Sequence, residues 1–407
     1  MSAHPFPTPR FSPLCYAITR LLGRTYLRRV LGVKTIEQFH AHRYSEALDS
    51  FKRGERRLIL AFRHTAVEDA PLLLVGTAKK SHLSFLYGRD VLNWAGASAR
   101  IFFPRLAFIA VQNRGSSRAG LTHLRQAATN GRFPLALAPE GQVTYHAHRC
   151  GPLESGVAQL ALWAGETGAE VTILPVAIAY RYSDDSASLL TDLLVRWQQE
   201  SGFRLEVASP EQLLATACEN TLELVASHWK VALEAVGSFT ARRDHLCAAL
   251  LEYAEEEAGL GPQTGSIIDR LYRLRFFAED TLFGPQEGIS LEQRERTHSY
   301  LIALQTVDVL EYLDPSYITE EISAARMVEV ALTLLDVTNR IAGGSIDSRY
   351  SPKEKVGGLY FGEPIDLSAT APAGNTRKER IAQIMAAVAD GLTQSSAALE
   401  EEWTLHF

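Results

Sequence analysis

Two ionisable side chains, His64 and Asp69, follow a short apolar run and are spaced for acid–base chemistry. The run Leu58–Phe62 is typical of a buried strand, and a helical pattern begins just after it. In open α/β sheets, catalytic groups gather at the ends of such strands. A carboxylate beside an imidazole fixes the tautomer of the ring and stabilises the imidazolium formed when the ring takes a proton. The pair could therefore deprotonate a substrate hydroxyl without a nucleophilic serine.

The alternative for this pair is structural: a surface histidine followed by an aspartate that the helix macrodipole favours at the first turn. Three further blocks bear on the choice, because each coincides with a strand-like run. An arginine follows the run 108–111, a Pro-Glu-Gly-Gln turn follows the run 135–138, and a Pro-Val pair lies inside the run 171–180. The residues of these blocks are Arg114, Pro139 to Gln142, Pro175 and Val176.

In this order and spacing, the four blocks resemble the glycerolipid acyltransferase family, whose members include lysophosphatidate acyltransferase. That family carries a His-x-x-x-x-Asp motif, an arginine block, a Pro-Glu-Gly block and an apolar block with Pro-Val, in the same sequence. The resemblance covers about residues 50–182. The later segment Gly357–Ile365 is similar to the closing Gly-x-Pro-Ile element of the family. The ordered set of blocks is specific, whereas any one of them is common.

The resemblance implies an O-acyltransferase in which His64 is the general base and Asp69 orients it. The enzyme would move an acyl chain from an acyl carrier protein or coenzyme A thioester to a hydroxyl of a glycerol-phosphate or lysophospholipid acceptor, a step of phospholipid biosynthesis. No metal or other cofactor is implied. Two alternatives remain open: an acyltransferase or thioester hydrolase that uses a non-phospholipid acceptor, and a non-catalytic lipid-binding protein with an acyltransferase-like fold.

The same resemblance assigns the substrate-binding residues. Arg114 would face the acceptor phosphate, since a guanidinium matches phosphate oxygens in a bidentate way. Glu140, with Gly141, would shape the contacts to glycerol. Arg89 would stand for a lysine that the family often uses near the acyl group.

The chain also departs from the family pattern. Arg63 precedes the histidine where the family usually has asparagine or another small polar residue. Gln142 and Val143 replace the usual Thr-Arg after Pro-Glu-Gly, which removes a potential phosphate ligand. These differences bear more on the acceptor than on the reaction.

Other site chemistries find little support in the sequence. His146, His148 and Cys150 are residue types that ligate zinc, but no second paired cluster supplies further ligands. We therefore expect a polar loop there and no metal site. The chain has no Gly-x-Ser-x-Gly elbow, phosphate-binding Gly-Lys-Ser/Thr loop or Gly-x-Gly-x-x-Gly fingerprint.

The elements that must position these residues alternate between strands and helices up to about residue 183, and the later pattern is mostly helical. A capping box at Ser209, with Pro210 and Gln212, predicts the start of one of the later helices. Strand character returns at Gly358–Leu367. We predict an α/β fold with a mixed, largely parallel sheet flanked by helices and a large all-helical insertion. The predicted parts are an N-terminal basic amphipathic helical segment (1–45), an acyltransferase core (46–183), an acidic helical insertion (184–350) and a closing strand with a C-terminal helix (351–407).

The composition agrees with a globular protein of one large or two medium domains: 407 residues, 46% hydrophobic and 22% charged. Four scattered cysteines rule out a disulfide framework and favour a reducing compartment. We read no signal peptide and no stretch of eighteen apolar residues, so we expect a cytoplasmic protein.

The net charge of −6 is unevenly distributed. Residues 184–350 carry 13 Lys and Arg against 28 Asp and Glu, a balance of −15, and the rest of the chain has a balance of +9. Residues 11–32 combine apolar bulk with Arg20, Arg24, Arg28 and Arg29 and contain no acid. This composition is typical of an interfacial helix, so we expect peripheral binding to an anionic membrane surface. The alternative is a helix whose apolar face packs on the core. The acidic insertion would face away from the membrane and could meet a protein partner, and no nucleic-acid partner is expected.

Overall fold

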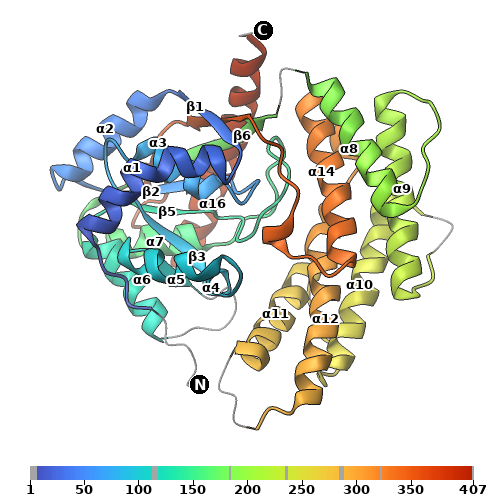
Figure 1. Cartoon of the computed structure of the whole chain (residues 1–407). Helices are drawn as coiled ribbons and strands as arrows, with labels where there is room; N and C mark the ends of the chain where they lie inside the picture. The colour runs from blue at the N-terminus through green and yellow to red at the C-terminus, as the bar shows by residue number, and fades with distance from the viewer. Residues whose placement is uncertain are drawn as a thin grey trace. The chain divides into compact units, whose positions relative to one another are not determined.

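The chain forms two compact units, an α/β unit of Phe6–Ser183 and Pro352–Phe407 and a helical unit of Asp184–Ser351. The computed structural model (Figure 1) describes residues 7–111, 118–182, 185–233, 237–283, 288–320 and 323–405. The helical unit lies in the sequence between strands β6 (Glu170–Arg181) and β7 (Lys355–Phe361). The α/β unit is therefore assembled from two stretches of chain that are far apart in sequence.

An eight-stranded sheet forms the centre of the α/β unit, in the order β1-β7-β6-β2-β5-β3-β4, with β8 beside β6. Strands β6, β2, β5, β3 and β4 are parallel to their neighbours in this series, whereas β7 and β8 run antiparallel to β6, and β1 is parallel to β7. The predicted α/β class with a mixed, largely parallel sheet flanked by helices is confirmed. The strand bounds not yet given are β1 (Val33–Phe39), β2 (Arg56–Phe62), β3 (Ser84–Gly88), β4 (Ile109–Val111), β5 (Leu135–Leu137) and β8 (Ile365–Asp366).

Strands β2 and β6 are almost continuously buried, which explains their uninterrupted apolar sequences. Ile59 and Ile173 belong to a core shared with α7 (Gly156–Gly165) and α16 (Arg377–Leu405). On the opposite face, α2 (Ala41–Lys52) packs against β2, and α3 (Asp69–Thr77), whose Leu72 is fully buried, packs against β1 and β7. Strand β2, which ends two residues before His64, is thus covered on both faces.

Two consecutive glycines in β7 allow helices to approach both faces of the sheet. A Cβ at Gly357 would lie 2.7 Å from the Leu72 side chain of α3, and a Cβ at Gly358 would lie 2.5 Å from Trp403 of α16. Successive residues of a strand point to opposite faces, so each glycine makes room for one helix. Larger residues here would push α3 or α16 away from the sheet.

The N-terminal region is part of the α/β unit and is not wholly helical. It contains α1 (Pro13–Arg29), strand β1 and α2 (Ala41–Lys52). The predicted helical segment of residues 1–45 thus includes a strand, because β1 pairs with β7. That partner strand comes more than three hundred residues later in the chain (Val33 pairs with Lys355), so the local pattern did not indicate the pairing.

The remaining helices of the α/β unit are α4 (Val91–Trp94), α5 (Gly96–Arg105), α6 (Arg118–Asn130) and α15 (Leu367–Thr370). Among the residues that the structure describes, no helix combines the length and apolar character needed to cross a bilayer.

Several helices of the helical unit begin with a serine cap. Ser209 and Gln212 form the predicted capping box at the start of α9, and Ser290 and Gln293 form a second one at α12. Such caps satisfy backbone N–H groups that have no partner inside the helix. The helices of this unit are α8 (Ser186–Ser201), α9 (Pro210–Trp229), α10 (Phe239–Glu257), α11 (Ile267–Phe283), α12 (Leu291–Leu310), α13 (Ser316–Glu320) and α14 (Ala324–Ile341), followed by the 3₁₀ turn Ile346–Ser348.

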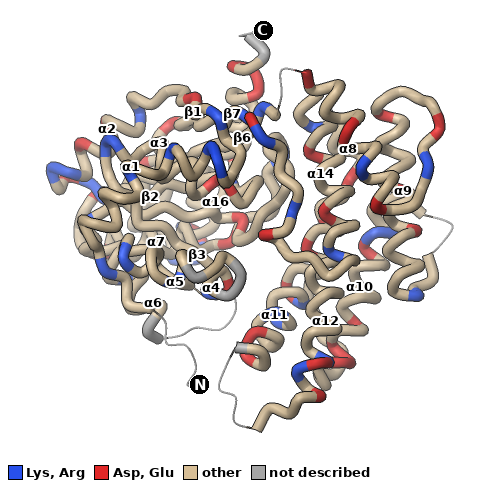
Figure 2. The backbone as a smooth tube through the Cα atoms, in the orientation of Figure 1, with Lys and Arg blue, Asp and Glu red and all other residues tan. Residues whose placement is uncertain are grey.

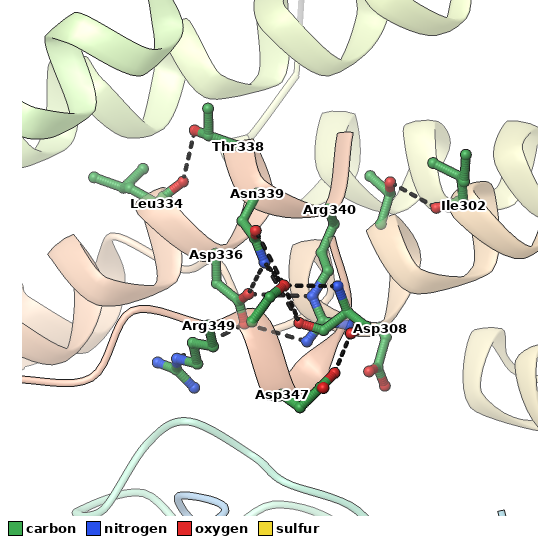
Figure 3. Close-up of polar contacts among 12 residues, drawn as sticks. Ile302, Asp308, Leu334, Asp336, Thr338, Asn339, Arg340, Asp347 and Arg349 are labelled. Carbon is green, nitrogen blue, oxygen red and sulfur yellow. Dashed lines mark hydrogen bonds and ion pairs between the residues drawn. The ribbon is translucent and has the colours of Figure 1, made fainter. Parts of the chain in front are cut away.

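A polar network at the end of α14 holds the chain that leaves the helical unit (Figure 3). The buried Asp336 carboxylate accepts hydrogen bonds from Arg340 and lies 3.7 Å from the guanidinium of Arg349. Asn339 donates to Ser345 O and Ser348 Oγ in the turn that follows. The connection toward β7 is therefore fastened to α14. Acidic positions recur along the helices of this unit (Figure 2), as its negative balance requires.

Candidate active site

The end of β2 and the first residue of α3 bring His64 and Asp69 together. His64 Nδ1 lies 3.2 Å from Asp69 Oδ2. The Asp69 side chain is fully buried, whereas 26% of the His64 side chain is exposed. The pair therefore has one protected end and one end that solvent or a substrate can reach.

Asp69 is held by more than the histidine. Its Oδ2 atom also accepts hydrogen bonds from the backbone N–H groups of Thr65 (2.5 Å) and Ala66 (2.8 Å), and its Oδ1 atom accepts one from the Tyr180 hydroxyl (2.7 Å). Burial raises the pKa of Asp69, and the hydrogen bonds from His64, Ala66 and Tyr180 act against that rise. The carboxylate has a fixed orientation because each of its oxygens has defined donors.

This geometry decides which nitrogen of His64 is available for chemistry. Because the carboxylate of Asp69 accepts at Nδ1, the neutral ring carries its proton there and presents Nε2 as the base. Among the residues that the structure describes, Nε2 has no hydrogen-bond partner. The His64 ring can thus accept a proton from a bound molecule.

The Pro-Glu-Gly turn lies against the histidine through Glu140. Glu140 Oε2 accepts a hydrogen bond from the backbone N–H of His64 (2.6 Å), and Oε1 accepts one from Arg63 Nε (2.7 Å). The side chains of Arg63 and Glu140 are both 0% exposed. Gly141 follows with a φ of 75°, a backbone conformation that favours glycine. Glu140 is therefore directed into the protein beneath the histidine.

Arg63 organises the loop after this turn. Its Nη2 atom donates to the carbonyl oxygens of His146 (2.8 Å) and Arg149 (2.7 Å), and Nη1 donates to Ser396 Oγ of α16 (3.0 Å). Thr144 adds a backbone hydrogen bond of 2.8 Å to His64 O. The segment 140–149 is thereby tied to the end of β2 on both sides of the histidine.

The other predicted binding residues are placed by the parallel strands. Because β2, β5, β3 and β4 are parallel, the residues that follow them lie along one edge of the sheet. Arg89 follows β3, and its backbone N–H donates to Val111 O at the end of β4 (2.9 Å). Gln142 is buried. Arg114 lies outside the described residues.

The loop that follows the Pro-Glu-Gly turn contacts α16 through His148. His148 Nδ1 lies 3.3 Å from Glu400 of α16, and burial raises the pKa of the Cys150 thiol. Within the described ranges, no group of three or more His, Cys, Asp or Glu side chains is arranged to hold a metal ion. This loop supports the site through contacts to the sheet and to α16.

Three residues next to the pair were not predicted from the sequence. Tyr180 comes from the end of β6, and the buried Glu68 and Lys355 form an ion pair with 2.5 Å between Oε1 and Nζ. Lys355 Nζ also lies 5.3 Å from the centroid of the Tyr180 ring. The available signal was the polar character of two positions: Lys355 is the first residue of β7, and Tyr180 is the last residue of the strand-like run 171–180.

Comparison with known proteins adds no assignment: no protein-family model matches the chain, and no curated protein matches it.

Proposed function

We propose that the protein is an O-acyltransferase that moves an acyl chain from a thioester of coenzyme A or acyl carrier protein to a hydroxyl of a glycerol-phosphate or lysophospholipid acceptor. The observation that carries this proposal is the pair of His64 and Asp69, with 3.2 Å between Nδ1 and Oδ2, one buried carboxylate and one accessible ring. The ordered motifs that resemble the glycerolipid acyltransferase family support the substrate class.

The proposed reaction is a single displacement at the thioester carbonyl. His64 Nε2 takes the proton of the acceptor hydroxyl while the hydroxyl oxygen attacks the carbonyl carbon. The tetrahedral intermediate then breaks its C–S bond, and the departing thiolate takes the proton back from the imidazolium. Asp69 stabilises that imidazolium without being protonated. No covalent intermediate on the protein is needed.

The binding residues act in two ways in this proposal. Arg114 faces the acceptor phosphate, and Arg89 lies near the acyl group. Glu140 and Gly141 act on the acceptor contacts indirectly, because Glu140 is buried and holds the backbone of His64. Glu140 is thus a positioning residue in this mechanism.

The His64→Ala variant tests the proposed reaction. We expect its rate to fall by at least about a hundredfold, the usual contribution of a general base. Products from a mixed pool of lysophosphatidate, glycerol 3-phosphate and other lysolipids would be identified by mass spectrometry with each thioester donor. The matched control is His228→Ala, a histidine of α9 in the helical unit. Near-normal turnover by purified His64→Ala would overturn the mechanism.

A phosphate-free acceptor, or water, is the second candidate. The observation that favours it is Gln142, an uncharged buried residue at the position after Pro-Glu-Gly. Arg114→Ala separates the two candidates. If the acceptor carries a phosphate, the variant raises the apparent KM of that acceptor more than it changes saturation by the donor. An equal loss with phosphate-bearing and phosphate-free acceptors would remove the phosphate from the proposal.

We also propose that the protein is cytoplasmic and meets the membrane peripherally through α1. Only Gly23 and Leu27 of this helix are buried. The arginines of α1 are exposed. Large apolar side chains of α1, and of the residue that follows it, are exposed as well: Leu14, Leu21, Leu22, Tyr26 and Val30. This arrangement supports an interfacial helix over one whose apolar face is used up in packing.

A further inference from the structure

We propose that Tyr180 is a positioning residue that acts through Asp69 on the proton affinity and orientation of His64. The proposal rests on the proposed function, and it adds strand β6 to the elements that build the site. The juxtaposition that carries it is the hydrogen bond from the Tyr180 hydroxyl to Asp69 Oδ1, 2.7 Å long and fully buried.

The two oxygens of Asp69 have separate partners. Oδ2 accepts hydrogen bonds from His64 Nδ1 and from two backbone N–H groups, whereas Oδ1 accepts one from the Tyr180 hydroxyl. The rotation of a carboxylate about its last bond is only weakly restricted by its own sterics. Tyr180 therefore fixes the plane of the carboxylate, which in turn fixes the direction of Oδ2 toward the histidine.

Tyr180 is itself held in place and kept as a donor. Its ring lies against Lys355 Nζ, which pairs with Glu68 at the start of α3. Burial and the nearby charges of Asp69 and Glu68 raise the pKa of Tyr180 well above its usual value. The hydroxyl is therefore protonated throughout the working pH range and donates to Asp69.

The charged and titratable groups around this pair come from several elements. Lys355 of β7 and Glu68 form an ion pair and so neutralise each other, and Tyr182 follows β6. Burial, followed by the nearby charge of Glu68, raises the pKa of Tyr26 in α1. None of these contacts is changed by removing the Tyr180 hydroxyl. A change in pH dependence after that removal would thus report on Asp69 and His64.

The sign of the effect follows from charge. The hydroxyl stabilises the carboxylate more when His64 is neutral than when an imidazolium already balances it. Its loss therefore increases the proton affinity of the His64–Asp69 pair. In Tyr180→Phe, the acid limb of kcat/KM should move to higher pH, and kcat should fall about tenfold with the KM values nearly unchanged.

The matched control is Tyr317→Phe in the helical unit. Tyr317 is fully buried, and its hydroxyl donates to the buried carboxylate of Glu329 over 2.6 Å. The two variants lose the same kind of hydrogen bond. Tyr317→Phe should therefore lose similar stability but keep the wild-type kcat and pH profile.

A second variant covers the case in which Tyr180→Phe does not fold. A ring-fluorinated tyrosine introduced at position 180 alone keeps the shape and makes the hydroxyl a stronger donor, so the acid limb should move to lower pH. A double variant adds a further check: if Tyr180 acts through Asp69, Tyr180→Phe should cost little further activity in Asp69→Asn.

The outcomes separate the two proposals. An unshifted acid limb in both Tyr180 variants, or full additivity with Asp69→Asn, overturns the role of Tyr180 while His64→Ala remains inactive. Full activity of His64→Ala overturns the proposed function itself.

Discussion

Arg63 and Glu140 form a buried ion pair directly beneath the histidine of the candidate site. Arg63 uses its remaining N–H groups on the carbonyl oxygens of the following loop, and Glu140 uses its second oxygen on the backbone of His64. Such a pair stabilises little by itself, because taking two charges out of water costs about as much as their attraction returns. Its effect is to hold one loop in one position.

The Glu140→Gln variant should therefore be strongly destabilised. The substitution leaves the Arg63 guanidinium buried without its counter-charge, which costs about 3–5 kcal/mol of the free energy of unfolding. Denaturant unfolding of the purified variants measures this. Glu166→Gln, which breaks the exposed pair with Arg125, is the control and should change the midpoint little. In the double variant Arg63→Met, Glu140→Gln, we expect part of the lost free energy of unfolding to be recovered. An unaltered midpoint in Glu140→Gln would contradict this account.

Glu311 gives the helical unit a pH-dependent stability. Burial, followed by the nearby charge of Asp308, raises its pKa to about 7, with Arg243 and Arg275 acting against the rise and Asp244 adding to it. Its Oε2 atom is buried without a hydrogen-bond partner among the described residues. A carboxyl whose folded pKa is raised binds more protons when folded than when unfolded. Stability is therefore lost as pH rises from the unfolded pKa, near 4.5, through about 7.

We expect Glu311→Gln to be more stable than the wild type above neutral pH. The gain should approach about 3 kcal/mol at about pH 8, shrink to about 1 kcal/mol near pH 5 and vanish below the unfolded pKa, where the Glu311 carboxyl is uncharged in both the folded and the unfolded state. Unfolding midpoints measured across this range test the prediction. The comparison variant is Glu292→Gln, an exposed acid of α12 that should show no such trend. A pH-independent difference between Glu311→Gln and the wild type would show that the carboxyl does not titrate in this window.

At the scale of elements, α1 has more exposed apolar surface than its packing uses. Its buried side faces α3, where a Cβ at Gly23 would lie 2.7 Å from Val75. Its exposed side carries Leu14, Leu21 and Leu22, with 70%, 78% and 53% of their surfaces accessible. An apolar stripe with arginines around it suits the boundary between lipid headgroups and acyl chains.

Replacing Arg20, Arg24, Arg28 and Arg29 with glutamine should weaken binding to anionic liposomes. Each basic residue near an anionic surface contributes about 1 kcal/mol, so the loss should reach roughly 4 kcal/mol at low salt. Cosedimentation with vesicles of anionic and of neutral lipid measures it, with binding expected to fall as salt rises. The control variant has glutamine in place of Arg204, Lys230, Arg294 and Arg296 of the helical unit, so its net charge changes as much as that of the α1 variant. Equal binding by the two variants, or none by the wild type at low salt, would refute the interfacial role of α1.

At the scale of the whole molecule, the helical unit is inserted where a β-hairpin would otherwise turn. Strands β6 and β7 are antiparallel neighbours, and Arg181 pairs with Val356. The chain thus leaves and re-enters the sheet at adjacent positions, although the whole helical unit lies between them in the sequence. Strand β7 lies between β6 and β1, so the sheet is interrupted without it.

Replacing residues 183–354 with Asn-Gly, the preferred two-residue hairpin turn, should leave a soluble and cooperatively folding α/β unit. The shortened protein keeps Lys355 and every residue around His64. Its comparison is a chain that ends at residue 350, which keeps all four motifs but lacks β7, β8 and α16 and should be insoluble. Solubility and thermal unfolding of both proteins test this. A soluble, cooperatively folding fragment 1–183 would show that β7 is not needed by the sheet.

The sequence alone determined the features that depend on local pattern. The alternation of apolar runs and amphipathic stretches indicated the α/β class, and the Ser209 capping box located the start of α9. The spacing of His64 and Asp69 was informative because a strand end and the next helix turn bring such residues together. Helix α8 and strand β1 were not predicted, since β1 is defined by its pairing with β7.

Only the tertiary structure decided which side chains complete the site. Tyr180 meets Asp69 across a separation of 111 residues, and Lys355 meets Glu68 across 287. Arg63, which the sequence marked only as a departure from the motif that the chain resembles, is the residue that binds the loop to the sheet. Contacts of this kind depend on strand order and register, because neighbouring positions in the sheet come from stretches that no local periodicity connects. The sequence therefore showed which residue types were present, and only the fold showed which of them lie beside the histidine and what they do there.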